Sequence, residues 1–168
     1  MSAASVEWFS IGIVLHHTSI DVLKRSLSSL LEALESLVQS QVDKSEGLRV
    51  GVYFLDNSLD QVYSSRVEGV LTELSPKGGA GVDVYHHVLD DNLGYGAANN
   101  TLLSMLSSRF HLVLNPDVYL ERDALVCAVD YLQSRSDVVL LTPKIDGEHV
   151  VKSYPDCLTL ILRYFESK

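Results

Sequence analysis

Cysteine and positive charge are both scarce in this chain of 168 residues. Its two cysteines, Cys127 and Cys157, stand far apart, without the spacing of a metal site and too few for a disulfide framework, so we expect a cytoplasmic protein. Lys and Arg total 13 against 22 Asp and Glu, which gives a net charge of -9 and argues against a nucleic-acid partner. An anionic ligand must therefore be held locally, by backbone amides, a metal ion or a few side chains.

Long apolar runs are also missing, which excludes a membrane span of the usual length. The first residues, "MSAASVEWFSIGIVLHH", lack a basic region, and Glu7 and Ser10 interrupt their apolar run, so they do not form a signal peptide. A hydrophobic content of 46% allows one sizeable core, and we expect a single domain over residues 1–168. Peripheral attachment to the inner face of a membrane is the alternative to a free cytoplasmic location.

Buried apolar runs alternate with amphipathic segments along the chain. We expect strands at these residues: 8–15, 48–55, 82–89, 110–120 and 137–145. We expect helices at these: 21–38, 60–74, 99–108 and 122–135, with a further short helix in the tail 157–168. This alternation predicts an α/β fold with a mainly parallel sheet. Ligands of such sheets bind at the carboxyl ends of the strands, near the point where strand order reverses.

The stretch "DNLGYGAANN" (91–100) follows the third predicted strand and is rich in glycine and asparagine. Gly94 and Gly96 allow a ligand to approach the backbone or permit positive φ, with the aromatic Tyr95 between them. The exposed amides of a helix that begins here would favour a diphosphate. A tight strand-to-helix turn explains the glycines equally well, but it leaves Asn99 and Asn100 unexplained.

The second predicted strand ends in "FLDNS", with Asp56 and Asn57 at its carboxyl end. Such side chains often bond nearby backbone amides and start the next helix, which is a purely structural explanation. The functional alternative is that Asp56 accepts a hydrogen bond from a ligand N–H, such as the imide of a pyrimidine base.

The fourth predicted strand, within "LVLNPDVYL", is interrupted by Pro116, which cannot donate to a strand ladder. The strand should end or bulge there and project Asn115 and Asp117 from the edge of the sheet. A lone carboxylate beside an amide suits a hard divalent cation that takes its other ligands from water and phosphate. A simple turn is the alternative, although a turn would not explain why an aspartate, Asp117, follows the proline.

In combination these segments resemble glycosyltransferase family 2. The segments "SIGIVLHHTS", "YFLDNS", "DNLGYGAANN", "LVLNPDVYLERDAL" and "VVLLTPKI" occur in the order and approximate spacing of that family. The chain is most similar to its rhamnosyltransferase-like branch, over residues 8–158. The resemblance implies the GT-A fold, a Rossmann-like α/β/α sandwich, here shorter at its C-terminus than is usual in the family.

The resemblance also implies a set of residues that bind a nucleotide-diphosphate-sugar donor: Asp56, Asn57, Asn92, Gly94, Tyr95, Asn99, Asn115 and Asp117. Asp56 would contact the base, and Asn92, Gly94 and Asn99 would lie beside the sugar and diphosphate. "NPD" stands where relatives carry an Asp-x-Asp motif, so Asp117 would bind Mg²⁺ or Mn²⁺. The acidic segment that supplies the general base in the family has no match here, and no catalytic residue is assigned.

The function implied is transfer, with inversion, of a sugar from a dTDP-rhamnose or UDP-sugar type of donor to a cell-surface or lipid-linked glycan, as in polysaccharide biosynthesis. The alternative is a catalytically incomplete nucleotide-sugar-binding module. A nucleotidyltransferase is disfavoured, because "HHTSID" after the first strand has neither glycine nor lysine. We also expect a homo-oligomer or partner chain to cover the short C-terminus, with "LTLILRYF" (158–165) as the contact surface.

Overall fold

A computed structural model describes residues 7–41, 48–74 and 81–142, which form a four-stranded parallel sheet in the order β3-β2-β1-β4. The strands are β1 (Phe9–Leu15), β2 (Val50–Asp56), β3 (Val82–Val88) and β4 (Phe110–Val113). The helices are α1 (Ile20–Ser40), α2 (Gln61–Leu74), α3 (Tyr95–Met105) and α4 (Ala124–Ser134). Strands and helices alternate along the chain, so the predicted α/β fold with a parallel sheet is confirmed.

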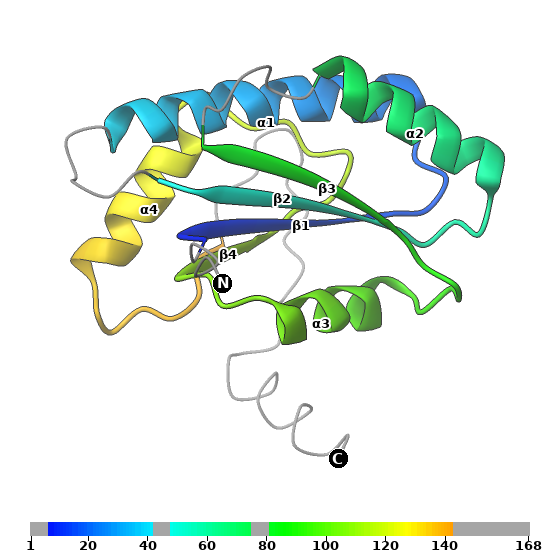
Figure 1. Ribbon diagram of the computed structural model, residues 1–168. Helices are drawn as coiled ribbons and strands as arrows, with labels where there is room; N and C mark the ends of the chain where they lie inside the picture. Colours follow the sequence, from blue (N-terminus) through cyan, green and yellow to red (C-terminus); the bar gives the residue numbers. More distant parts are fainter. Residues whose placement is uncertain (1–6, 42–47, 75–80, 143–168) are drawn as a thin grey trace, which may run out of the picture.

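The sheet lies between two layers of helices. Helices α1, α2 and α4 cover one face and α3 covers the other (Figure 1). Strand β1 is buried along its whole length and pairs with β2 on one side and β4 on the other. The order of strands therefore reverses between β1 and β4, which is the point where open α/β sheets bind their ligands.

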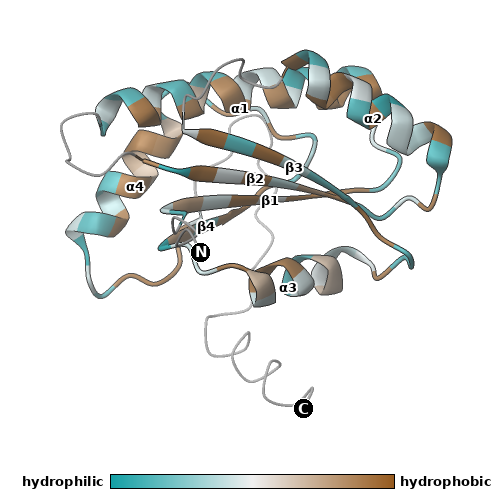
Figure 2. Cartoon of the chain, in the orientation of Figure 1, coloured by the Kyte–Doolittle hydropathy of each residue, from teal (hydrophilic) through white to brown (hydrophobic). Residues whose placement is uncertain are grey.

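The hydrophobic core has one part on each face of the sheet. The larger part is built on residues such as Ile11 and Phe54, which are 0% exposed, together with the inner sides of α1, α2 and α4. The smaller part joins Val14 and Leu55 to Ala98 and Leu102 of α3. Figure 2 shows largely apolar residues in β1 and β2, and helices α1 and α2 in which apolar and polar residues alternate. No helix in the described ranges has the length and apolarity that crossing a bilayer requires.

The predicted fifth strand is wrong over the residues that the structure describes. Residues 137–142 form no strand, and the side chains of Val139 and Leu140 are 97% and 68% exposed. An apolar, β-branched run becomes a strand only where a neighbour accepts its hydrogen bonds, and this segment pairs with none of the described strands. Residues 143–145 and the predicted tail helix lie outside the described residues, as does the contact surface 158–165.

Two boundaries also differ from prediction, both beside the ligand-binding edge. Strand β4 ends at Val113, although the amide of Leu114 still donates to the Gly12 carbonyl at 3.0 Å. Helix α3 begins at Tyr95, four residues before the predicted start at 99. Gly94 precedes it with φ of 75°, a conformation that a residue with a side chain rarely adopts.

A glycine-to-alanine substitution should lower the free energy of unfolding at position 12, where α3 packs closely against β1, and raise it at the exposed position 69. In Gly12→Ala the new Cβ would lie 2.8 Å from Leu102 Cδ2 and 3.3 Å from the His111 ring, so we expect a loss of about 1–3 kcal/mol from overpacking. In Gly69→Ala the Cβ meets no atom within 4 Å on an exposed part of α2, so we expect a gain of up to about 1 kcal/mol. Urea denaturation measures the free energy of unfolding of both variants. Equal changes in the two would contradict the close packing around Gly12.

Candidate functional site

A cleft of about 470 Å³ opens at the carboxyl ends of β1 and β4. Its lining comes from the end of β1, the loop after it and the first turn of α1, together with the start of α3 and the loop after β4: Val14, His16, Thr18, Ser19, Val22, Tyr95, Asn115, Pro116 and Asp117. These segments meet because parallel strands bring their carboxyl ends to one edge of the sheet. The cleft therefore lies where strand order reverses.

The predicted site residues divide into three positions around this cleft. Tyr95, Asn115 and Asp117 line it directly. Asp56 and Asn57 are buried, at 0% and 2% exposure, and do not line it. Three further predicted residues lie in or near the loop that leads into α3: Asn92 and Gly94, which are exposed, and Asn99, which is buried.

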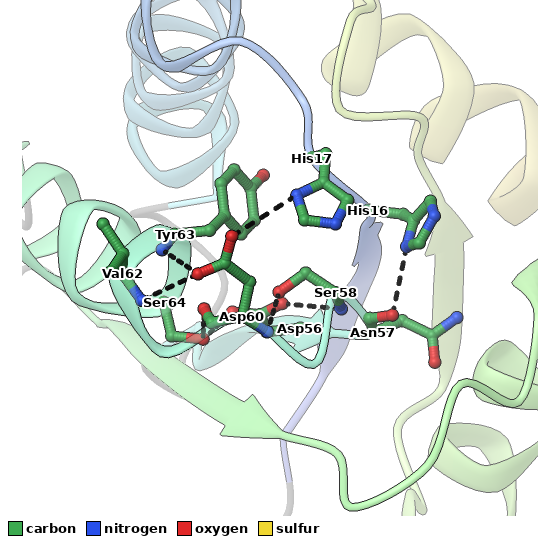
Figure 3. Close-up of polar contacts among 9 residues, drawn as sticks. All are labelled: His16, His17, Asp56, Asn57, Ser58, Asp60, Val62, Tyr63 and Ser64. Atoms are coloured by element: carbon green, nitrogen blue, oxygen red, sulfur yellow. Dashed lines mark hydrogen bonds and ion pairs between the residues drawn. The ribbon is translucent and has the colours of Figure 1, made fainter.

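The Asp56 carboxylate has partners within the protein (Figure 3). One oxygen accepts from the Ser58 amide at 3.0 Å, and the other accepts from the Ser64 hydroxyl and lies 3.6 Å from His86 Nε2. Burial alone would raise the pKa of Asp56. Hydrogen bonds from Ser58 and Ser64, helped by the His86 ring, outweigh that effect and hold the pKa below its usual value. Asp56 is thus an ionised anchor for the turn that follows β2.

The adjacent histidines of the loop after β1 have different partners (Figure 3). His16 lines the cleft, whereas His17, at φ 54°, lies with its Nδ1 4.0 Å from the Asp60 carboxylate. Asp60 also caps α2, because its Oδ1 accepts from the amides of Val62 and Tyr63 at 2.9 and 3.1 Å. His16 thus belongs to the lining of the cleft, and His17 to that of a neighbouring hollow.

The orientation of His16 follows from its partner. Its Nδ1 lies 3.1 Å from the carbonyl oxygen of Asn57. A carbonyl oxygen can only accept, so Nδ1 carries the proton in this contact. In the neutral ring Nε2 is then the acceptor, and the His16 side chain belongs to the lining of the cleft.

Asn57 joins the end of β2 to the loop before α3. Its Oδ1 accepts from the Leu93 amide at 2.9 Å, and its Nδ2 donates to Asn92 Oδ1 at 2.8 Å. Asn92 Oδ1 also accepts from the Gly94 amide at 3.0 Å. Both polar atoms of the Asn57 side chain are therefore engaged with the loop.

The first turn of α3 has unsatisfied hydrogen-bonding groups. Gly94, at the N-cap position, has no side chain, and no side chain in the described part of the chain caps the helix, so the first-turn amides lack a capping acceptor there. Asn99 Nδ2 donates to the Tyr95 carbonyl at 2.9 Å, while its buried Oδ1 has no partner among the described residues. Burial raises the pKa of the Tyr95 hydroxyl, and the charge of Asp117 adds to this against the opposing effect of Asn99. Tyr95 therefore remains a neutral hydroxyl at the cleft.

Asp117 is the one carboxylate among the described residues that line the cleft, and Asn115 also belongs to that lining. Within residues 7–41, 48–74 and 81–142, no three His, Cys, Asp or Glu side chains converge as a metal site would require. A carboxylate and an amide oxygen suit Mg²⁺ or Mn²⁺ only if phosphate oxygens and water complete the coordination. This donor set fits a cation that arrives with a diphosphate.

Sequence reasoning did not identify Ser64 and His86 as partners of Asp56. Neither belongs to a motif, and both reach the carboxylate through the fold: Ser64 from α2, and His86 from β3, where it pairs in register with Phe54. His86 and His87, which are adjacent in β3, face opposite sides of the sheet. His86 lies beside Asp56, whereas the His87 ring stacks with Tyr53 at 6.2 Å between centroids.

Replacing Ser64 by Ala should destabilise the protein in a pH-dependent way. At neutral pH the loss of a hydrogen bond to a buried carboxylate should cost about 1.5–3 kcal/mol. The pKa of Asp56 is lower in the folded protein than in the unfolded chain, where it is about 3.9. The stabilisation by this charged hydrogen bond is therefore complete at pH values above the unfolded-state pKa, and it is lost as the pH falls through the folded-state pKa. Urea denaturation at a series of pH values should show the deficit shrinking in acid.

Ser65→Ala is the matched control, since Ser65 lies on the exposed side of the same helix and bonds only the Gln61 carbonyl. It should change stability by less than about 0.5 kcal/mol at every pH. A deficit for Ser64→Ala that is equal at neutral and acid pH would contradict the role given to Asp56.

Comparisons with known proteins reveal similarity in fold. No family model and no curated protein matches the chain. Among solved structures, it is similar to S. aureus TarS 1-349, with a TM-score of 0.53 and 21% identity over 86% of this chain and 38% of that one. A second TarS structure gives a TM-score of 0.52 and 20% identity, with coverage of 75% and 19%.

A further similar structure is the mannosyltransferase PcManGT from Pyrobaculum calidifontis in complex with GDP-Man and Mn2+, with a TM-score of 0.53 and 16% identity over 76% of this chain and 32% of that one. The chain thus spans well under half the length of each of these proteins. At such identities the likeness concerns the fold, and it shows that the chain has the α/β fold of GT-A glycosyltransferases.

Proposed function

We propose that the chain binds a nucleotide-diphosphate-sugar in the cleft and transfers the sugar, with inversion, to a glycan acceptor. The observation that carries this proposal is the pairing of Asp117 with the uncapped start of α3 at one cleft. Helix amides and a cation held by a carboxylate both favour a diphosphate. They also supply what a protein with a net charge of -9 needs in order to hold an anion.

The size and lining of the cleft are consistent with such a ligand. Its volume of about 470 Å³ lies within the usual range for small-molecule sites. Its lining includes the polar residues His16, Tyr95 and Asn115. These groups can contact hydroxyl and phosphate oxygens around the reacting centre. A divalent cation, when bound by Asp117, would neutralise charge on the leaving diphosphate.

The reaction is a single displacement at the anomeric carbon. The bond from that carbon to the diphosphate oxygen breaks, a bond to an acceptor hydroxyl oxygen forms, and the acceptor proton passes to a base. Asp56 remains our proposed contact for the nucleotide base. Because Asp56 is 0% exposed and bonded to Ser58 and Ser64, this contact requires the turn after β2 to open.

The finer assignments rest on the sequence resemblance. We propose a donor of the dTDP-rhamnose or UDP-sugar type, a cell-surface or lipid-linked acceptor, and a role in polysaccharide biosynthesis at the inner face of a membrane. GDP-mannose is a further donor to test, because the similar mannosyltransferase is in complex with GDP-Man and Mn2+. A second candidate is a module that binds the donor without transferring it, because no general base has been assigned.

Calorimetric titration with UDP, dTDP and GDP, with and without Mn²⁺, tests donor binding. We expect one nucleotide to bind in a Mn²⁺-dependent manner. Asp117→Ala should weaken this binding about tenfold or more, because a lost charged contact is worth about 1.5–3 kcal/mol. Asp130→Ala is the matched control, since it removes the same charge from the exposed side of α4.

Binding that is unaffected by Asp117→Ala would contradict the proposed site, and the absence of binding to wild type would contradict the proposed function. Incubating the protein with the matching nucleotide-sugar then distinguishes a transferase from a module that only binds the donor. A transferase should release nucleoside diphosphate when acceptor is added, whereas a binding module should release none.

A further inference from the structure

The orientation of the Asn57 side chain is fixed by a backbone amide. The Leu93 amide can only donate, so the Asn57 atom that lies 2.9 Å from it must be the acceptor, Oδ1. The amino group Nδ2 then points at Asn92, 2.8 Å away. Because Asn57 is only 2% exposed, it cannot turn to meet a ligand without breaking both bonds.

The same reasoning fixes the orientation of Asn92. Two donors converge on one of its side-chain atoms, Asn57 Nδ2 at 2.8 Å and the Gly94 amide at 3.0 Å. Only an oxygen can accept from both, so this atom is Oδ1. Asn92 is exposed, and its Nδ2 makes no hydrogen bond to any other described residue. The clamp formed by Asn57, Asn92 and the amides of Leu93 and Gly94 therefore leaves a hydrogen-bond donor free.

We infer that Asn57 is a positioning residue that sets the polarity of Asn92, so that Asn92 presents its Nδ2 hydrogens to an oxygen of the donor's diphosphate. This inference rests on the proposed function. The clamp lies directly before the uncapped first turn of α3, whose amides also favour an anion. A free amino group adds a further donor, whereas a reversed Asn92 would present an oxygen that repels phosphate.

Two single substitutions separate the clamp from the group that faces the ligand. In Asn92→Asp one oxygen still accepts from Asn57 and Gly94, but the exposed position carries a charged acceptor instead of a donor. In Asn57→Asp the bond from Leu93 survives, but residue 57 can no longer donate, so Asn92 must turn its Nδ2 inward. Asn100→Asp is the matched control, because it makes the same change at an exposed position of α3 outside the clamp.

The ligand test uses the nucleoside diphosphate that binds wild type with Mn²⁺. Asn92→Asp and Asn57→Asp should each weaken its binding about tenfold or more, whereas Asn100→Asp should stay within about twofold, since an exposed charge is screened by solvent. Equal affinity of wild type and Asn92→Asp would overturn the inference and leave the proposed function intact. If wild type binds no nucleotide, both are overturned.

Amide hydrogen exchange in the ligand-free protein tests the clamp itself. In wild type and Asn92→Asp the amides of Leu93 and Gly94 should both be protected. In Asn57→Asp exchange at Gly94 should accelerate while Leu93 stays protected, because only the acceptor for Gly94 has turned away. Thermal unfolding checks that the variants fold. If the Asn57→Asp variant does not fold, the nucleotide affinity of Asn92→Asp alone tests the inference. Unchanged exchange at Gly94 in a folded Asn57→Asp variant would overturn the assigned polarity.

Discussion

The parallel pairing of β1 with strands on both sides is the constraint on which the site depends. β1 is in register with β2 over Phe9–Leu15 and with β4 over Phe9–Gly12. The connection from β1 runs to α1 on one face of the sheet, and the chain enters β4 from α3 on the other face. A cleft therefore opens where these connections part, and every residue that lines it is placed by a strand end or by the helix that follows.

The turn after β2 holds this edge of the sheet together. The backbone amide of Asn57 donates to the Leu15 carbonyl at 2.9 Å, and the Asp56 carbonyl accepts from the Leu89 amide at 2.9 Å. These bonds connect the ends of β1 and β3. Polar groups at 0–2% exposure would be costly without partners, and both side chains have them, Asp56 in Ser58 and Ser64 and Asn57 in the loop before α3. The buried anchors thus position exposed groups that can meet a ligand.

Four of the five strands that the sequence predicts are confirmed, as is the edge where a cleft opens, because buried apolar runs and the polar residues after them are local signals. It does not predict that residues 137–142 stay unpaired, since pairing depends on a neighbouring strand edge. The sequence also does not predict the roles of Asn57 and Asn92, because a side-chain amide can bond either a ligand or a loop. Which of these it bonds depends on the register of β1, β2 and β3. Helix α3 begins early because Gly94 adopts a positive φ. A glycine in a simple turn can adopt the same conformation, so the sequence does not predict where the helix begins.

A crystal structure with a nucleotide-diphosphate-sugar and Mn²⁺ tests the central claim most directly. Our account predicts the diphosphate between Asp117 and the first turn of α3, with Tyr95 and Asn92 within hydrogen-bond distance of its oxygens. Density for the ligand in another hollow, such as the one lined by His17 and Arg66, with the cleft left empty, would contradict the assignment of this cleft as the donor site.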